Sequence, residues 1–98
     1  MNILDYPAWT NGEYCTVKDL KISVLDLGLI HSDATYDVLA VKNKVIQNLD
    51  SHLLRLQQSA HGWRLPIPIS IKNLTTIIEK LIEQAEVDDL LVWIGLIS

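Results

Sequence analysis

The most constraining stretch of this sequence is GLIHSDATYDVLAVKN, residues 28–43, in which a polar segment runs into alternating β-branched and apolar residues. This alternation is typical of a β-strand, and Asn43-Lys44 predicts a turn at its end. The faces of such a strand would carry Tyr36, Val38 and Ala40 on one side and Asp37, Leu39 and Val41 on the other. This stretch could form the wall of a pocket, or it could simply be the well-packed start of a strand. The residues alone leave both interpretations open.

The composition indicates one globular domain over residues 1–98, because 49% of the residues are hydrophobic, which is ample for a core. The net charge is -4 and the eight Lys and Arg form no basic stripe, which argues against a nucleic-acid partner. The single cysteine, Cys15, cannot form an internal disulfide and favours a reducing compartment, so we expect a cytoplasmic protein. The apolar runs are too short to cross a bilayer, so we expect no membrane partner.

Turn residues divide the amino-terminal half into short strands. Asn11-Gly12 predicts a β-hairpin over residues 8–15 with a type I′ turn, which needs two residues that accept a positive φ. Residues 22–25 are a plausible short strand. After the turn at Asn43-Lys44, Val45-Ile46 would begin the return strand.

Two segments have the periodicity of amphipathic helices. The first carries an apolar stripe from Leu49 to Ala60, with Asp50 or Ser51 predicted as its N-cap and Gly62 as its stop signal. Arg55 lies off this stripe. The second covers residues 71–86, follows the cap residue Ser70, and repeats apolar residues at i, i+3, i+4 and i+7 almost without interruption.

The last segment, LLVWIGLI over residues 90–97, is apolar on both faces, which predicts an interior strand that needs cover from something outside these residues. The order of strands, helix, helix and strand then predicts an α+β fold. We expect a mostly antiparallel sheet with two helices packed on it.

The residues alone identify no catalytic group and no metal site. His31, Ser32 and Asp33 are adjacent, so their side chains diverge and cannot form a catalytic relay. No Cys/His spacing fits a metal, and no glycine-rich phosphate loop is present. None of the six lysines has the apolar context that lowers a lysine pKa for Schiff-base chemistry.

Three segments in order resemble the amino-terminal domain of class IV (fold type IV) pyridoxal-phosphate aminotransferases. They are WTNGEY, then KISVLDLGLIHSDATYDVLAVKN, then LDSHLLRLQQSA followed by PIPIS. The family includes branched-chain and D-amino-acid aminotransferases, (R)-selective amine transaminases and aminodeoxychorismate lyase. The segment HSDATYDV is most similar to the D-amino-acid and (R)-amine branch of this family.

The resemblance implies roles for four residues. Arg55 matches the arginine that contacts the cofactor phosphate, and His31, Tyr36 and Val38 match positions that line the substrate pocket. We therefore expect Arg55 and Tyr36 to converge on one cavity. Asp37 stands where many relatives have Glu, and no role is assigned to it.

The resemblance also implies a second lobe that these residues do not contain, which supplies the Schiff-base lysine and most of the phosphate donors. Ile46, Gln47 and Asn48 replace the usual aromatic pair and Arg, and Lys44 replaces the usual turn Gly. The first hypothesis is an amino-terminal fragment, inactive alone, of an enzyme using pyridoxal 5'-phosphate. The parent would transfer an amino group between a small-molecule amino donor and a 2-oxo acid, as a homodimer. The alternatives are a non-catalytic assembly or binding module and half of an aminodeoxychorismate-lyase-type enzyme.

Overall fold

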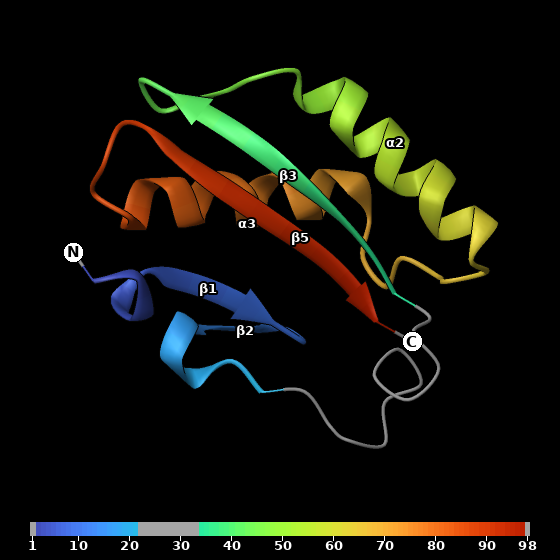
Figure 1. Cartoon of the computed structure of the whole chain (residues 1–98), viewed down its shortest axis with the longest axis horizontal. Coiled ribbons are helices and arrows are strands. Elements are labelled where there is room, and N and C mark those ends of the chain that lie inside the picture. The colour runs from blue at the N-terminus through green and yellow to red at the C-terminus, as the bar shows by residue number, and fades with distance from the viewer. Residues whose placement is uncertain (1, 22–33, 98) are drawn as a thin grey trace.

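Strand β3 (Ala34–Lys42) is the centre of a three-stranded antiparallel sheet in the order β4–β3–β5. Its neighbours are β4 (Val45–Ile46) and β5 (Leu90–Ile97), and β1 (Pro7–Thr10) and β2 (Glu13–Thr16) form a separate hairpin (Figure 1). This computed structural model describes residues 2–21 and 34–97, so the predicted strand at 22–25 lies outside the described residues. The predicted α+β class is confirmed.

Both predicted turns form with the backbone that a type I′ turn requires. The φ angles are 47° at Asn11 and 93° at Gly12 in the first turn, and 50° at Asn43 and 63° at Lys44 in the second. Short 3-10 helices η1 (Ile3–Asp5) and η2 (Val17–Asp19) flank the first hairpin. A lysine in the left-handed region is sterically disfavoured, so the second turn carries strain that the first does not.

Helix α3 (Ile71–Gln84) begins as predicted, because the Ser70 side chain accepts a hydrogen bond from the backbone N–H of Asn73. Helix α2 (Leu49–Gly62) begins before the predicted caps, so the assignment of Asp50 or Ser51 as N-cap is wrong. Its N-cap is Asn48, in the left-handed conformation with φ 54° and without a side-chain capping bond. Asparagine tolerates the left-handed conformation, and this conformation at Asn48 turns the chain into the helix.

Both helices pack on one face of the sheet (Figure 1). The core contains residues from β3, β5, α2 and α3, namely Leu39, Val41, Leu53, Leu56, Leu74, Ile78, Ile82, Val92 and Ile94. The opposite face is open among the described residues, where the side chains of Leu91 and Trp93 are 65% and 69% exposed. In the described sheet β5 pairs with β3 on one side only and has one covered face. The interior strand, with cover from outside these residues, stays a prediction.

Replacing Lys44 by glycine should stabilise the chain by about 0.5–1 kcal/mol, because glycine adopts a positive φ without a Cβ clash. The measurement is the urea midpoint at constant m-value. The matched control is Lys44→Ala, which removes the same charge but keeps a Cβ at φ 63°. Equal midpoints for the two variants would contradict the assignment of strain to this turn.

Replacing Leu56, which is 1% exposed, by alanine should cost about 2–5 kcal/mol through lost burial and an unfilled cavity. Leu54 lies on the same helix and is 56% exposed, so Leu54→Ala should change the free energy of unfolding by less than about 0.5 kcal/mol. Urea unfolding of the two variants measures the difference. Equal losses would show that α2 is not oriented by this buried stripe.

Candidate functional site

A buried carboxylate connects the central strand to helix α2. Asp37 is on the helix-covered face of β3, and its side chain is only 3% exposed. A carboxylate removed from water is costly unless it is hydrogen-bonded and paired with a positive charge. The helix supplies both through His52 and Arg55, which are one turn apart and so share one face.

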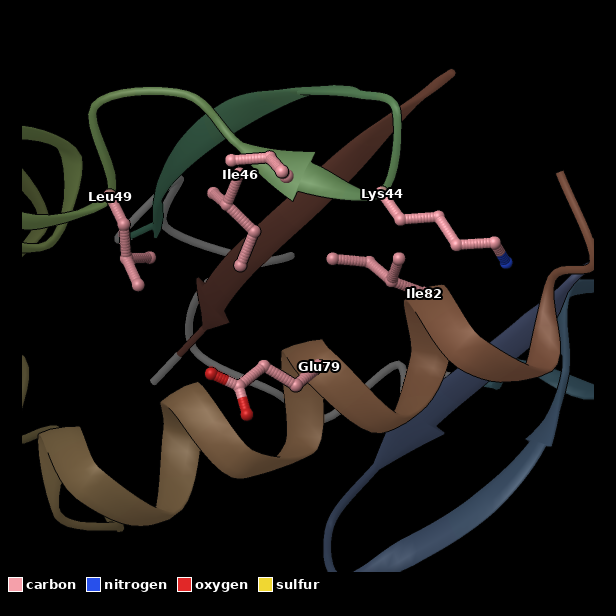
Figure 2. Close-up of a pocket in the computed structure, with 6 residues that line it drawn as sticks. Lys44, Ile46, Leu49, Glu79 and Ile82 are labelled. Carbon is pink, nitrogen blue, oxygen red and sulfur yellow. The ribbon is translucent and has the colours of Figure 1, made fainter. Parts of the chain in front are cut away.

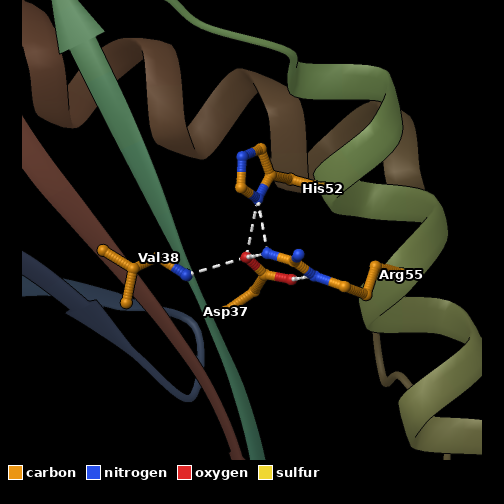
Figure 3. Close-up of polar contacts among 4 residues, drawn as sticks. All are labelled: Asp37, Val38, His52 and Arg55. Atoms are coloured by element: carbon orange, nitrogen blue, oxygen red, sulfur yellow. Dashed lines mark hydrogen bonds and ion pairs between the residues drawn. The ribbon is translucent and has the colours of Figure 1, made fainter.

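Asp37 accepts four hydrogen bonds (Figure 3). Arg55 donates from Nε to Oδ2 at 2.8 Å and from Nη2 to Oδ1 at 2.8 Å. Oδ1 also accepts from the backbone N–H of Val38 at 2.9 Å and lies 2.7 Å from Nδ1 of His52. Three of these donors meet Oδ1 and one meets Oδ2, so both oxygens of the buried carboxylate are hydrogen-bonded.

The geometry assigns the proton of His52. Its Nδ1 lies 2.7 Å from Oδ1 of Asp37 and 3.0 Å from Nη2 of Arg55. A lone pair on Nδ1 would repel the carboxylate at that distance, whereas an N–H is attracted to it. Nδ1 of His52 therefore donates to Oδ1 of Asp37. Nη2 of Arg55 donates to the same oxygen, so the contact between Nδ1 and Nη2 is one between two donors.

The ion pair sets the protonation of both partners. The hydrogen bonds from Arg55 hold the pKa of the Asp37 carboxyl well below its usual value, against the opposing effect of burial. The hydrogen bond from His52, the charge of Arg55 and the Val38 N–H act in the same direction as those bonds. The same pair raises the pKa of Arg55. Asp37 is thus ionised and Arg55 cationic at neutral pH.

The opposite face of the sheet carries an exposed aromatic pair. The rings of Tyr36 and Trp93 stack with centroids 5.2 Å apart and an interplanar angle of 9°. Gly95 is the register partner of Tyr36, and Val38 is the partner of Trp93. The stacked rings therefore form a diagonal cross-strand pair.

The structure does not bring the predicted site residues together. The Arg55 guanidinium binds a carboxylate on the helix-covered face of β3, whereas Tyr36 and Val38 belong to the other face. Adjacent strand positions point to opposite faces, so the described residues place Tyr36 and the carboxylate bound by Arg55 on different sides of β3. The convergence of Arg55 and Tyr36 on a cavity completed by a second lobe stays a prediction. His31 lies outside the described residues.

Sequence reasoning missed the two partners of Arg55. Asp37 was placed on the same strand face as Leu39 and Val41, and these apolar neighbours could have indicated that an ionisable group faces the core and requires a partner. His52 and Arg55 have the i, i+3 spacing of neighbours on a helix. Together these two signals could have indicated the cluster.

Two hollows on the described surface lie apart from the Asp37 cluster. The smaller, of about 370 Å³, is lined by Lys44, Val45, Ile46, Leu49, Glu79 and Ile82 (Figure 2). The larger, of about 700 Å³, runs between the first hairpin, α3 and β5, and Trp93 contributes to its lining. Among the described residues no three His, Cys, Asp or Glu side chains could hold a metal ion. No helix there is long and apolar enough to cross a membrane.

Comparisons with known proteins identify the family of this fold. The sequence pattern of the family described as amino-transferase class IV matches residues 34–96, from β3 through β5. The chain belongs to the class IV aminotransferase family. It is 29% identical over 70 residues to a Methanocaldococcus jannaschii protein that is provisionally named a branched-chain-amino-acid aminotransferase. It is 25% identical over 84 residues to a Staphylococcus aureus D-alanine aminotransferase.

Solved structures share the fold at low sequence identity. The branched-chain amino acid aminotransferase of Escherichia coli superposes with a TM-score of 0.82 over 94% of this chain at 22% identity. The branched-chain aminotransferase of Thermoproteus uzoniensis superposes with a TM-score of 0.77 over 91% of the chain at 17% identity. The fold is that of the amino-terminal domain of class IV aminotransferases.

The match covers only part of each relative. The sequence matches span 71% and 86% of this chain but 24% and 30% of the M. jannaschii and S. aureus proteins. The structural matches span 31% of each solved chain. The chain therefore corresponds to less than a third of the proteins that it resembles.

Replacing Asp37 by asparagine should lower the free energy of unfolding near neutral pH by about 1–3 kcal/mol, because an amide cannot accept from Nε and Nη2 of Arg55 together. The folded-state pKa of Asp37 is depressed, so its stabilisation is present above the unfolded pKa of about 3.9 and is lost as pH falls below that value. The gap between wild type and variant should therefore narrow in acid.

Urea unfolding across a pH series measures this gap. The control is Asp88→Asn, which removes the same charge at an exposed position, and its difference from wild type should stay small throughout. A gap for the Asp37 variant that stayed constant or widened below pH of about 4 would contradict the ion-pair account.

Proposed function

We propose that this chain forms the amino-terminal lobe of a pyridoxal-phosphate enzyme that transfers an amino group between an amino acid or amine and a 2-oxo acid. The observation that carries the proposal is the class IV family match over residues 34–96, because it covers β3, α2, α3 and β5 as one unit. Whole relatives of this family are named as aminotransferases. The chain alone, which is under a third of their length, would be inactive.

Arg55 is the residue of this chain that would hold the cofactor phosphate. Its guanidinium uses Nε and one hydrogen of Nη2 for Asp37, and no described residue bonds Nη1. Its side chain is 63% exposed, so these remaining donors are open to a ligand. A phosphate dianion accepts such paired N–H groups well, and the donor set therefore fits this part of the cofactor.

Tyr36 and Val38 would contact the substrate from the other face of β3. Residues 36 and 37 are adjacent and near the strand's amino-terminal end, so a second lobe that closes over that end can reach both faces. The stacked Tyr36 and Trp93 rings then provide an apolar wall that orients the substrate side chain and excludes water. His31 belongs to this proposed wall through the family resemblance.

The cofactor, when bound, supplies the electron sink that stabilises the negative charge formed at the substrate carbon. The residues of this chain contribute binding and orientation, with Arg55 acting on the phosphate and Tyr36 and Val38 on the substrate. The proton-transfer and covalent chemistry falls to residues of the second lobe. The assembled enzyme is proposed to be a cytoplasmic homodimer that takes a small amino donor and a 2-oxo acid.

The test begins with the reading frame downstream of codon 98. We expect it to continue into a second lobe, and the full product should bind pyridoxal phosphate and transfer amino groups. Borohydride reduction should trap the cofactor on one lysine of that second lobe. A stoichiometric reduced adduct at a unique lysine within residues 1–98 would overturn the proposed division between the lobes.

A further inference from the structure

The contact with Asp37 fixes the orientation of the Arg55 guanidinium. It leaves the outer edge of the guanidinium, formed by Nη1 and Nη2, available to a ligand. A guanidinium carries five N–H groups in a rigid plane. Asp37 takes the Nε hydrogen and one Nη2 hydrogen, at 2.8 Å each. The other three hydrogens, two on Nη1 and one on Nη2, lie away from the carboxylate, and the end formed by Nη1 and Nη2 is therefore a fork for an anion.

Asp37, which fixes this edge of Arg55, is itself held in place by other hydrogen bonds. Asp37 sits on the central strand, its side chain is 3% exposed, and the Val38 N–H and His52 Nδ1–H bind the same oxygen that binds Nη2. His52 lies on α2 one turn before Arg55, with its side chain 21% exposed. The carboxylate therefore cannot rotate without losing bonds to both the strand and the helix (Figure 3).

Arg55 would be mobile without this anchor, because its side chain is 63% exposed. A long exposed arginine loses much rotamer entropy when it is fixed on a ligand, and that loss weakens binding. A guanidinium already fixed by Asp37 has lost this freedom on folding, so an anion would meet a preorganised fork.

We propose that Asp37 is a positioning residue that, with His52, fixes the Arg55 guanidinium so that its Nη1–Nη2 edge receives a phosphate group. This rests on the proposed role of Arg55 as a ligand of the cofactor phosphate. It assigns functions to two residues, Asp37 and His52, that act through the arginine and do not touch the anion themselves.

Positioning and simple charge make opposite predictions for Asp37→Asn. The substitution removes one negative charge close to Arg55, so Coulomb attraction alone would tighten the binding of an anion. Loss of the fork's anchor would weaken binding instead, because the guanidinium must then be ordered by the anion. The sign of the change in affinity therefore separates the two accounts.

The experiment uses the ¹⁵N-labelled 98-residue chain and inorganic phosphate as the probe, with the backbone amides of residues 52–56 as the readout near neutral pH. Wild type should show saturable shifts that Arg55→Ala abolishes. Asp37→Asn should bind phosphate roughly tenfold more weakly, which is comparable to the loss of one hydrogen bond to a charged group. Asp88→Asn, with the same change in net charge, should bind within about twofold of wild type.

His52→Gln provides a second variant if Asp37→Asn fails to fold, since it removes the Nδ1–H donor to Asp37 and leaves the bonds between Asp37 and Arg55 in place. It should weaken phosphate binding about threefold, as the loss of one hydrogen bond predicts. Unchanged or tighter binding in the folded variants overturns the positioning role. Absence of any Arg55-dependent shift in wild type also overturns it.

These outcomes are independent of the amino-transfer assay. A chain that binds phosphate with the expected order of affinities but whose full product transfers no amino group would contradict the proposed function alone. A working aminotransferase with an unaltered Asp37→Asn phosphate affinity would contradict the positioning role alone.

Discussion

The constraint on which this structure depends is a carboxylate placed in the core. Asp37 occupies a strand position whose neighbours on the same face, Leu39 and Val41, are buried, and the side chain cannot reach water. Its charge persists because helix α2 brings Arg55 and His52 to it. The position of α2 on the sheet is thereby specified by polar geometry as well as by the apolar stripe of the helix.

The alternation of β3 separates two kinds of surface within one strand. One face holds the core and the cationic edge of Arg55, and the other holds the open aromatic pair of Tyr36 and Trp93. Under the proposed function, the Arg55 edge would meet the cofactor phosphate and the aromatic pair would meet apolar parts of the substrate. A single strand thus presents different chemistry on its two faces, because successive side chains of a strand point to opposite sides of the sheet.

Much of the fold follows from local rules that act within a few residues. The Asn11-Gly12 turn, the Ser70 cap and the periodicity of α3 were all predictable because each depends on backbone geometry or on one repeating face. The start of α2 was mispredicted because a left-handed Asn48 at its N-cap replaces the usual side-chain cap. The position of β5 at the edge of the described sheet depends on which strands pair with it, and such long-range pairing leaves no local signal.

The site was less predictable than the fold. Family resemblance drew attention to Arg55, but the contact that fixes it joins residues 18 positions apart on different elements. Strand parity alone would have placed Asp37 on the same face as Leu39 and Val41, and Tyr36 on the opposite face from the carboxylate that binds Arg55. Sequence similarity to a family indicates which residues are candidates for a functional role. The alternation of side chains along the strand determines which of them can contact one another.

The Nε–H resonance of Arg55, followed by NMR as pH is lowered, tests the buried ion pair most directly. The account predicts a downfield Nε–H chemical shift that stays constant as the pH falls to about 4, where an ordinary aspartate is half protonated, because the pKa of Asp37 is held lower. A chemical shift that moves to the value of a free arginine by that pH would contradict the account.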